Sequence, residues 1–335
     1  DLNQSMVYYK RVINEFPGTS EAEEALMGLR GVYMDQNDPN GYISYTNQIG
    51  GFARVDDRQR DSLTYIAAER QYLAGNCEGS LAQLDSYLQS FPEGRFALNA
   101  HFYKADCLYR AGRMDEALSS FEYVSGRGKS LFSEDTIKYA GQIHYHNKRY
   151  SNALDYFRRL EEEADLEENR QEAIIGQMRA LSKMDNAAST LSAAEKVIGN
   201  SRMAAEIVRE ARFIKAASYM QLGDASKALG EYRIIAANPS SREGAESKYM
   251  VAQLLYNDNK TDEAAEEIFD FVSKGTPHQY WMARSFILLS DIYAGRQEYF
   301  QATQYLESLL ENYTSTDDDI RTLAGQKLEQ YKAKQ

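Results

Sequence analysis

The chain has 335 residues, with 50 aspartate and glutamate residues against 38 lysine and arginine residues, and a formal net charge of -12. This balance argues against a nucleic-acid partner, which requires a basic stripe, and disfavours an anionic membrane surface. No apolar run reaches the ~18–20 residues that a membrane-spanning helix needs, so we expect no direct membrane insertion. Few prolines and abundant Ala, Glu, Leu and Tyr favour a mostly helical chain.

The first 17 residues predict a single amphipathic helix. Its apolar face consists of Met6, Tyr9, Val12, Ile13 and Phe16, and Pro17 follows it. Residues 1–17 are therefore interpreted as the second helix of a truncated repeat. We expect upstream repeats of the same longer chain, or a targeting signal, before Asp1.

Residues 18–315 predict eight helical hairpins, of which the first is the weakest. The first hairpin consists of a helix over 20–36 and a short helix that ends near 49, and the fifth consists of two helices within 169–199. The helix pairs of the other six hairpins are expected at 57–74 and 80–91, at 98–111 and 115–124, at 133–148 and 150–163, at 203–222 and 225–237, at 241–257 and 262–273, and at 280–294 and 299–312. Residues 37–41 are expected to form a turn, and the acidic stretch 161–168 a solvated connection. A last helix in 316–335, apolar on one side and lysine-rich on the other, predicts a cap.

The hairpin at 98–124 is the best formed. Gly112 stands where the first helical pattern stops, as expected of a C-cap residue with positive φ. Ala117 is small where the two helices would cross closely, and Phe121 is large where the gap widens. An isolated amphipathic hairpin cannot bury both of its stripes, so this one requires neighbours.

Three residue classes recur with one period. Gly75, Gly112 and Gly223 are 37 and then 111 residues apart, and 111 is three times 37. The same period, near 37, spaces a set of small residues: Ala117, Ala153, Ala228, Ala264 and Ala302. The Phe-Pro pairs at 16–17 and 91–92 are two periods apart. The fifth hairpin has Met184-Asp185-Asn186 in place of the turn glycine.

These residues resemble the tetratricopeptide repeat (TPR) family. The matching stretches read A-D-C-L-Y-R-A-G-R-M-D-E-A-L-S-S-F, A-A-S-Y-M-Q-L-G-D-A-S-K-A-L-G-E-Y and S-D-I-Y-A-G-R-Q-E-Y-F-Q-A. The F-P-x-G ending and the longer period are similar to the variant found in bacterial cell-envelope proteins. The resemblance implies an all-α, right-handed α-solenoid of about eight hairpins with a C-terminal capping helix, and a location in the cell envelope or periplasm.

No motif predicts a catalytic, cofactor or metal site. Residues 126–130 end like a phosphate-binding loop, but position 123 is tyrosine rather than glycine, so a turn between repeats is favoured. His144 and His146 are two residues apart on a helix and cannot share one metal ion. The aspartates at 56–61 and 317–319 begin helices, where carboxylates cap free N–H groups.

Cys77 and Cys107 are the only two cysteines, too few for a disulfide framework. A single bridge is one alternative. The other, two buried or free thiols, is favoured because one cysteine lies at a helix start and the other in the middle of a helix of the next repeat.

The resemblance also implies a partner-binding surface, because the first helices of TPR hairpins line the concave side. By motif position it contains Tyr65, Glu69, Tyr72, Asn99, Phe102, Asp106, Tyr109, Lys138, Gln142, Tyr145, Tyr249, Gln253 and Tyr256. Tyrosine suits peptide recognition, although the same rings could instead fill space between repeats. We therefore predict a non-enzymatic scaffold that binds a protein or peptide segment. The alternatives are an architectural or self-association module without a groove ligand, and an all-helical α/α enzyme.

Overall fold

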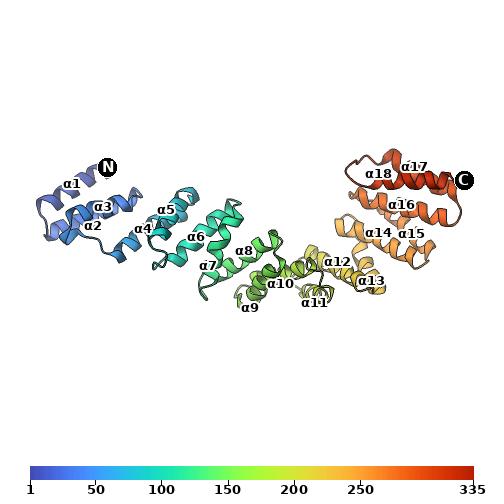
Figure 1. Ribbon diagram of the computed structural model, residues 1–335, viewed down its shortest axis with the longest axis horizontal. Coiled ribbons are helices and arrows are strands. Elements are labelled where there is room, and N and C mark those ends of the chain that lie inside the picture. The colour runs from blue at the N-terminus through green and yellow to red at the C-terminus, as the bar shows by residue number, and fades with distance from the viewer. The chain divides into compact units, whose positions relative to one another are not determined.

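The computed structural model describes residues 1–335 and is entirely helical. It contains 18 α-helices, one short 3-10 helix and no strand, which confirms the predicted all-α class. The chain divides into two compact units, Asp1–Asp165 and Leu166–Gln335. Both units are built from helical hairpins, so each of them is a stretch of α-solenoid (Figure 1).

The first unit contains a leading helix and four hairpins. Helix α1 packs on α2, and the hairpins pair α2 with α3, α4 with α5, α6 with α7 and α8 with α9 (blue to green in Figure 1). The bounds are α1 Leu2–Glu15, α2 Ser20–Asp35, α3 Pro39–Ile49, η1 Gly51–Ala53, α4 Asp57–Leu73, α5 Cys77–Ser90, α6 Ala97–Arg110, α7 Met114–Ser125, α8 Ser133–His146 and α9 Tyr150–Glu163.

The second unit contains four further hairpins and a closing helix. The hairpins pair α10 with α11, α12 with α13, α14 with α15 and α16 with α17, and α18 packs on α16 and α17. The bounds are α10 Glu167–Ser182, α11 Ala187–Gly199, α12 Ala205–Gln221, α13 Ala225–Ala236, α14 Arg242–Asn257, α15 Thr261–Lys274, α16 Gln279–Gly295, α17 Tyr299–Asn312 and α18 Ile320–Lys332.

One residue with positive φ joins the two helices of every hairpin. The eight residues follow one another at intervals of 36 to 38 positions: Asn37, Gly75, Gly112, Lys148, Asp185, Gly223, Asn259 and Gln297. At the third turn, the N–H of Gly112 donates to Tyr109 and the N–H of Arg113 donates to Leu108, which satisfies carbonyls at the end of α6. The predicted positive φ of Gly112 is confirmed, at 75°.

The small residues expected at the helix crossings are buried. The five alanines of the predicted series are completely buried: Ala117, Ala153, Ala228, Ala264 and Ala302. Phe121 is also completely buried and packs in one cluster with Ala117. A small and a large side chain together fill the core of this hairpin, as the close packing of protein interiors requires.

Several predicted boundaries were wrong; α5, for example, begins at Cys77 rather than at 80. Helix α3 begins at Pro39, inside the expected turn, because proline is preorganised for the first turn of a helix and the Asp38 carboxylate accepts a hydrogen bond from the N–H of Gly41 at 2.8 Å. The acidic stretch is mostly helical, since α9 continues to Glu163 and α10 begins at Glu167. Asp56 caps α4 as predicted, with Gln59 completing a capping box.

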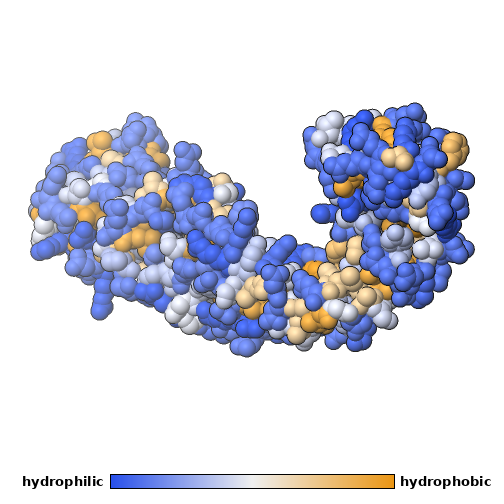
Figure 2. Space-filling model, turned by 45° about the vertical axis from the view of Figure 1, so that its right-hand side comes forward, coloured by the Kyte–Doolittle hydropathy of each residue, from blue (hydrophilic) through white to orange (hydrophobic).

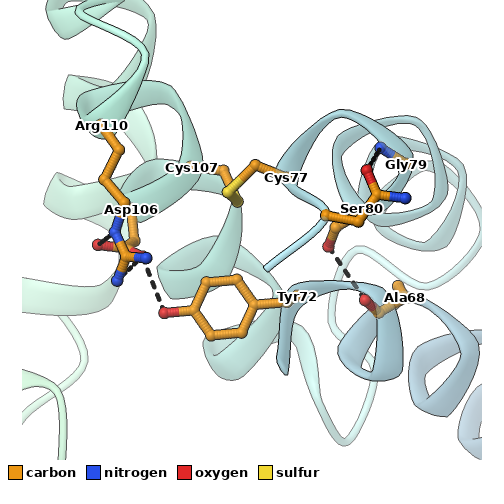
Figure 3. Close-up of a disulfide and its surroundings, with 9 residues drawn as sticks. Ala68, Tyr72, Cys77, Gly79, Ser80, Asp106, Cys107 and Arg110 are labelled. Atoms are coloured by element: carbon orange, nitrogen blue, oxygen red, sulfur yellow. Dashed lines mark hydrogen bonds and ion pairs between the residues drawn. A yellow bond between two sulfur atoms is a disulfide. The ribbon is translucent and has the colours of Figure 1, made fainter. Parts of the chain in front are cut away.

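The prediction of two free or buried thiols was wrong, because Cys77 and Cys107 form a disulfide. Cys77 is the first residue of α5, and its Cα lies 5.3 Å from that of Cys107 in the last turn of α6 (Figure 3). Helix α5 packs against both α4 and α6, so its first residue meets the side of the next first helix. The bridge therefore connects two consecutive repeats.

The surface is mostly hydrophilic, and its hydrophobic residues form separate patches on the face that Figure 2 shows. This distribution agrees with the acidic composition of the chain. None of the helices combines the length and the apolar character needed to cross a bilayer.

Candidate partner-binding face

The candidate residues occupy four first helices. Helix α4 carries Tyr65, Glu69 and Tyr72, α6 carries Asn99, Phe102, Asp106 and Tyr109, α8 carries Lys138, Gln142 and Tyr145, and α14 carries Tyr249, Gln253 and Tyr256. We call this set the first-helix face. Its ten residues in the first unit and its three in the second are described separately.

A hydrogen bond between side chains joins α4 to α6. The Tyr72 hydroxyl donates to the Asp106 carboxylate at 2.8 Å, and Arg110 forms an ion pair with the same carboxylate at 2.8 Å (Figure 3). Burial and the bond to Asp106 raise the pKa of Tyr72. Tyr103 stacks on Tyr72 at 4.1 Å and donates to Glu69 at 3.2 Å. These contacts fix the two helices in register.

Tyr65 lies in the core beneath this face. It is 2% exposed, and its ring stacks on Phe96 with centroids 4.3 Å apart. Its hydroxyl donates to Glu69 at 2.5 Å and also lies in hydrogen-bonding contact with Asn99. Burial, followed by the bond to Glu69, raises the pKa of Tyr65. Tyr65 therefore positions Glu69 and Asn99 rather than presenting its own ring.

Tyr109 joins α6 to α8 in the same manner. Its hydroxyl donates to the Gln142 side chain at 2.9 Å, and its ring lies 4.6 Å from that of Tyr139. Phe102 is buried and stacks on Phe132 at 4.2 Å, directly before α8. The α6–α8 junction thus repeats the α4–α6 junction one period later.

The remaining residues of α8 have partners within their own hairpin, α8 and α9. Lys138 forms an ion pair with Asp135 at 2.8 Å. Tyr145 contacts Tyr150 edge to face, with centroids 5.4 Å apart. Both side chains remain partly exposed, so they can contribute to a contact surface.

In the second unit, Tyr249 joins α14 to α16. It is 7% exposed, donates to Gln253 at 2.9 Å and accepts a hydrogen bond from Arg284 at 3.2 Å. Gln253 donates in turn to Asn257 at 3.0 Å. Tyr256 packs against the adjoining core cluster and stays partly exposed.

Sequence reasoning missed that consecutive first helices are tied together by polar pairs. Besides the tyrosine pairs, Arg179 forms an ion pair with Glu210 at 2.7 Å, and Arg209 with Glu243 at 3.2 Å. The two residues of each pair are separated in the sequence by close to one repeat length. This spacing is the signal that could have indicated the pairs. A donor and an acceptor one period apart lie on neighbouring first helices.

No group of histidine, cysteine and carboxylate side chains in the structure has the geometry to hold a metal ion. His144 instead lies 3.1 Å from Glu122, through Nε2. The segment 126–130 connects α7 to α8, and its Gly128 has a positive φ. The segment therefore follows a helix, which agrees with the predicted turn between repeats.

The tetratricopeptide repeat family model matches residues 67–127 and 213–270, one stretch in each unit. No curated protein matches the chain in sequence. Among solved structures, the C-terminal part of a TPR repeat-containing protein from Cytophaga hutchinsonii is similar in fold, with 12% identity, a TM-score of 0.56, and coverage of 76% of this chain and 97% of that one.

Two other solved structures have lower TM-scores. A tetratricopeptide repeat protein from Parabacteroides merdae matches at 15% identity with a TM-score of 0.43, covering 81% of this chain and 98% of that one. A structure of Naa15/Naa10 bound to HypK-THB matches at 13% identity with a TM-score of 0.45, covering 82% of this chain and 39% of that one. The family model matches one stretch in each unit, and helical hairpins run through both units, so the chain contains tetratricopeptide repeats in each of them.

Proposed function

We propose that this protein is a non-enzymatic scaffold that binds a segment of a partner protein along its first-helix face. Tetratricopeptide repeats typically mediate protein–protein interaction, and the proposal assigns that role to one surface. The main support for the proposal is the hydrogen bonding between side chains of consecutive first helices, from Tyr72 to Asp106 and from Tyr109 to Gln142.

These bonds matter because they hold the face in one arrangement before a partner arrives. A preorganised surface loses less side-chain entropy on binding, and tyrosine offers a large contact area with few rotatable bonds. Partly exposed rings such as those of Tyr145 and Tyr256 supply the contact area.

The test is capture of partners from an extract of the native cells by the immobilised chain. Tyr145→Ala and Tyr256→Ala each remove one ring from the first-helix face, in the first and second unit respectively. Phe300→Ala is the control, because Phe300 is 66% exposed on α17, a second helix. The proposal predicts that a captured protein is lost with at least one tyrosine variant and kept with Phe300→Ala. Equal capture by all three variants would contradict it.

An architectural module without a groove ligand is the second candidate. It is favoured by the burial of Tyr65 and Tyr249, whose hydroxyls bond within the chain. It predicts that neither tyrosine variant alters capture.

We also propose that the chain works in an oxidising compartment, such as the cell envelope. The Cys77–Cys107 disulfide supports this, since such bridges persist in oxidising environments and are rare in reducing ones. Alkylation of thiols in freshly lysed cells is expected to label neither cysteine unless a reductant is added. Labelling without reductant would contradict the proposal.

A further inference from the structure

A groove separates α2 from α4 in the first unit. It has a volume of about 760 Å³, and its walls come from α2, α4 and the segment 52–56 between them. The next pair of first helices, α4 and α6, is closed by the Tyr72–Asp106 bond. The first pair instead has η1 and its flanking residues inserted between the helices, so the space remains open.

Three exposed hydrophobic side chains meet in this groove from three different elements. Met27 on α2 is 60% exposed, Phe52 in η1 is 38% exposed and Ile66 on α4 is 36% exposed. Gly31 lines the same wall, and a Cβ added there would meet nothing within 4 Å. Single exposed apolar residues are ordinary, but a cluster in a hollow marks a binding surface.

The rim of the groove is positively charged, although the chain carries a net charge of -12. Four arginines line it against two carboxylates: Arg30, Arg54, Arg58, Arg70, Glu23 and Asp56. Arg70 lies 3.4 Å from Asp35. Arg30, Arg54 and Arg58 form no ion pair within the chain and are exposed, so their guanidinium groups can bind carboxylates of another molecule.

We propose that this groove binds an acidic linear segment of a partner protein. The segment inserts a bulky apolar side chain between Met27, Phe52 and Ile66, while its carboxylates pair with the unpaired arginines of the rim. The apolar floor selects a peptide side chain, and the positive rim selects negative charge on either side of it. The inference rests on the proposed function and adds the place and the chemistry of the partner.

The experiment begins with selection of random 12-residue peptides, displayed on phage, by the full chain at low salt. We expect the enriched peptides to be acidic and to contain Leu, Ile, Phe or Trp. A fluorescein-labelled copy of the most enriched peptide is then titrated with the chain, and its anisotropy gives Kd. Because the contacts are charged at the rim, Kd is expected to rise with salt.

Two variants test the site in independent ways. Arg30→Glu combined with Arg58→Glu reverses the rim charge and is expected to raise Kd at least about tenfold, which corresponds to about 1.4 kcal/mol. The control is Arg158→Glu, an exposed arginine on α9, which should leave Kd unchanged.

Gly31→Phe fills the groove without changing its charge and is expected to abolish binding. Its control is Gly230→Phe on α13, where an added Cβ also meets nothing within 4 Å. Melting curves of both glycine variants are recorded to establish that each of them is folded.

The inference is overturned by enriched peptides that are neutral or basic, by unaltered binding to the Gly31→Phe variant, or by the absence of any enriched peptide. A dimer that Arg30→Glu with Arg58→Glu dissociates would identify a second copy as the occupant and also overturn it. Partner capture that Tyr145→Ala abolishes and Gly31→Phe leaves intact would refute the groove while the proposed function stands.

Discussion

Removal of the Cys77–Cys107 bridge should destabilise the first unit. The two cysteines are 30 residues apart in the chain, and closing a loop of this length in the unfolded state is worth about 3.5 kcal/mol by chain entropy. The bridge also fixes the start of α5 on the last turn of α6, one residue from Asp106 and its bond with Tyr72. We therefore expect Cys77→Ala with Cys107→Ala to lower the free energy of unfolding of this unit by about 3 kcal/mol.

Urea unfolding followed by circular dichroism measures this loss, and hydrogen exchange locates it. Exchange should become faster in α5 and α6, since repeats are stabilised mainly by their neighbours. The second unit contains no cysteine and serves as an internal control. A reductant should shift the unmodified protein to the stability of the double variant and leave that variant unchanged. Equal midpoints for the oxidised, reduced and substituted proteins would refute the reasoning.

Four substitutions test the repeat geometry and one partly buried histidine, His101. Gly112→Val should cost about 1–2 kcal/mol, because the residue has a left-handed φ; an unchanged melting temperature would contradict this. Ala117→Leu should cost about 1–3 kcal/mol by overpacking the helix crossing, and a neutral result in urea unfolding would mean that the helices do not cross there. Lys148→Gly should stabilise the protein by about 0.5–1 kcal/mol, because lysine is strained at φ 59°; a lower melting temperature would argue against strain at this turn. Burial, with Lys104 nearby, lowers the pKa of His101 to about 4 from 6.5, so its contribution to stability is complete above pH 6.5 and is lost as the pH falls toward 4. Stability measured across this window should depend less on pH in His101→Gln, and an identical pH dependence would exclude the histidine as a cause.

The hairpins were predictable because their turns and crossings require particular residues. A turn residue with positive φ favours glycine, and a close helix crossing requires a small residue such as alanine. In the sequence, Gly112 therefore indicates the turn and Ala117 the expected crossing. Other turns carry no local signal: Lys148 and Gln297 adopt the same φ without favouring it, and only the period indicates their positions.

The disulfide was not predictable from spacing, because it depends on how α5 lies against the next first helix. The candidate residues were placed on first helices correctly, but their bonding could not be derived from one repeat at a time. Tyr65 is buried because Phe96 of the next repeat stacks on its ring. The groove between α2 and α4 depends on the irregular segment 50–56, which follows no repeat pattern.

The most direct test of the scaffold proposal is photo-crosslinking in the native cells. A photoreactive phenylalanine analogue replaces Tyr145, on the first-helix face, or Phe300, on a second helix. The proposal predicts that irradiation joins a protein partner to position 145 and joins none to position 300. Adducts at position 300 alone, or at neither position, would contradict a partner-binding role for the first helices.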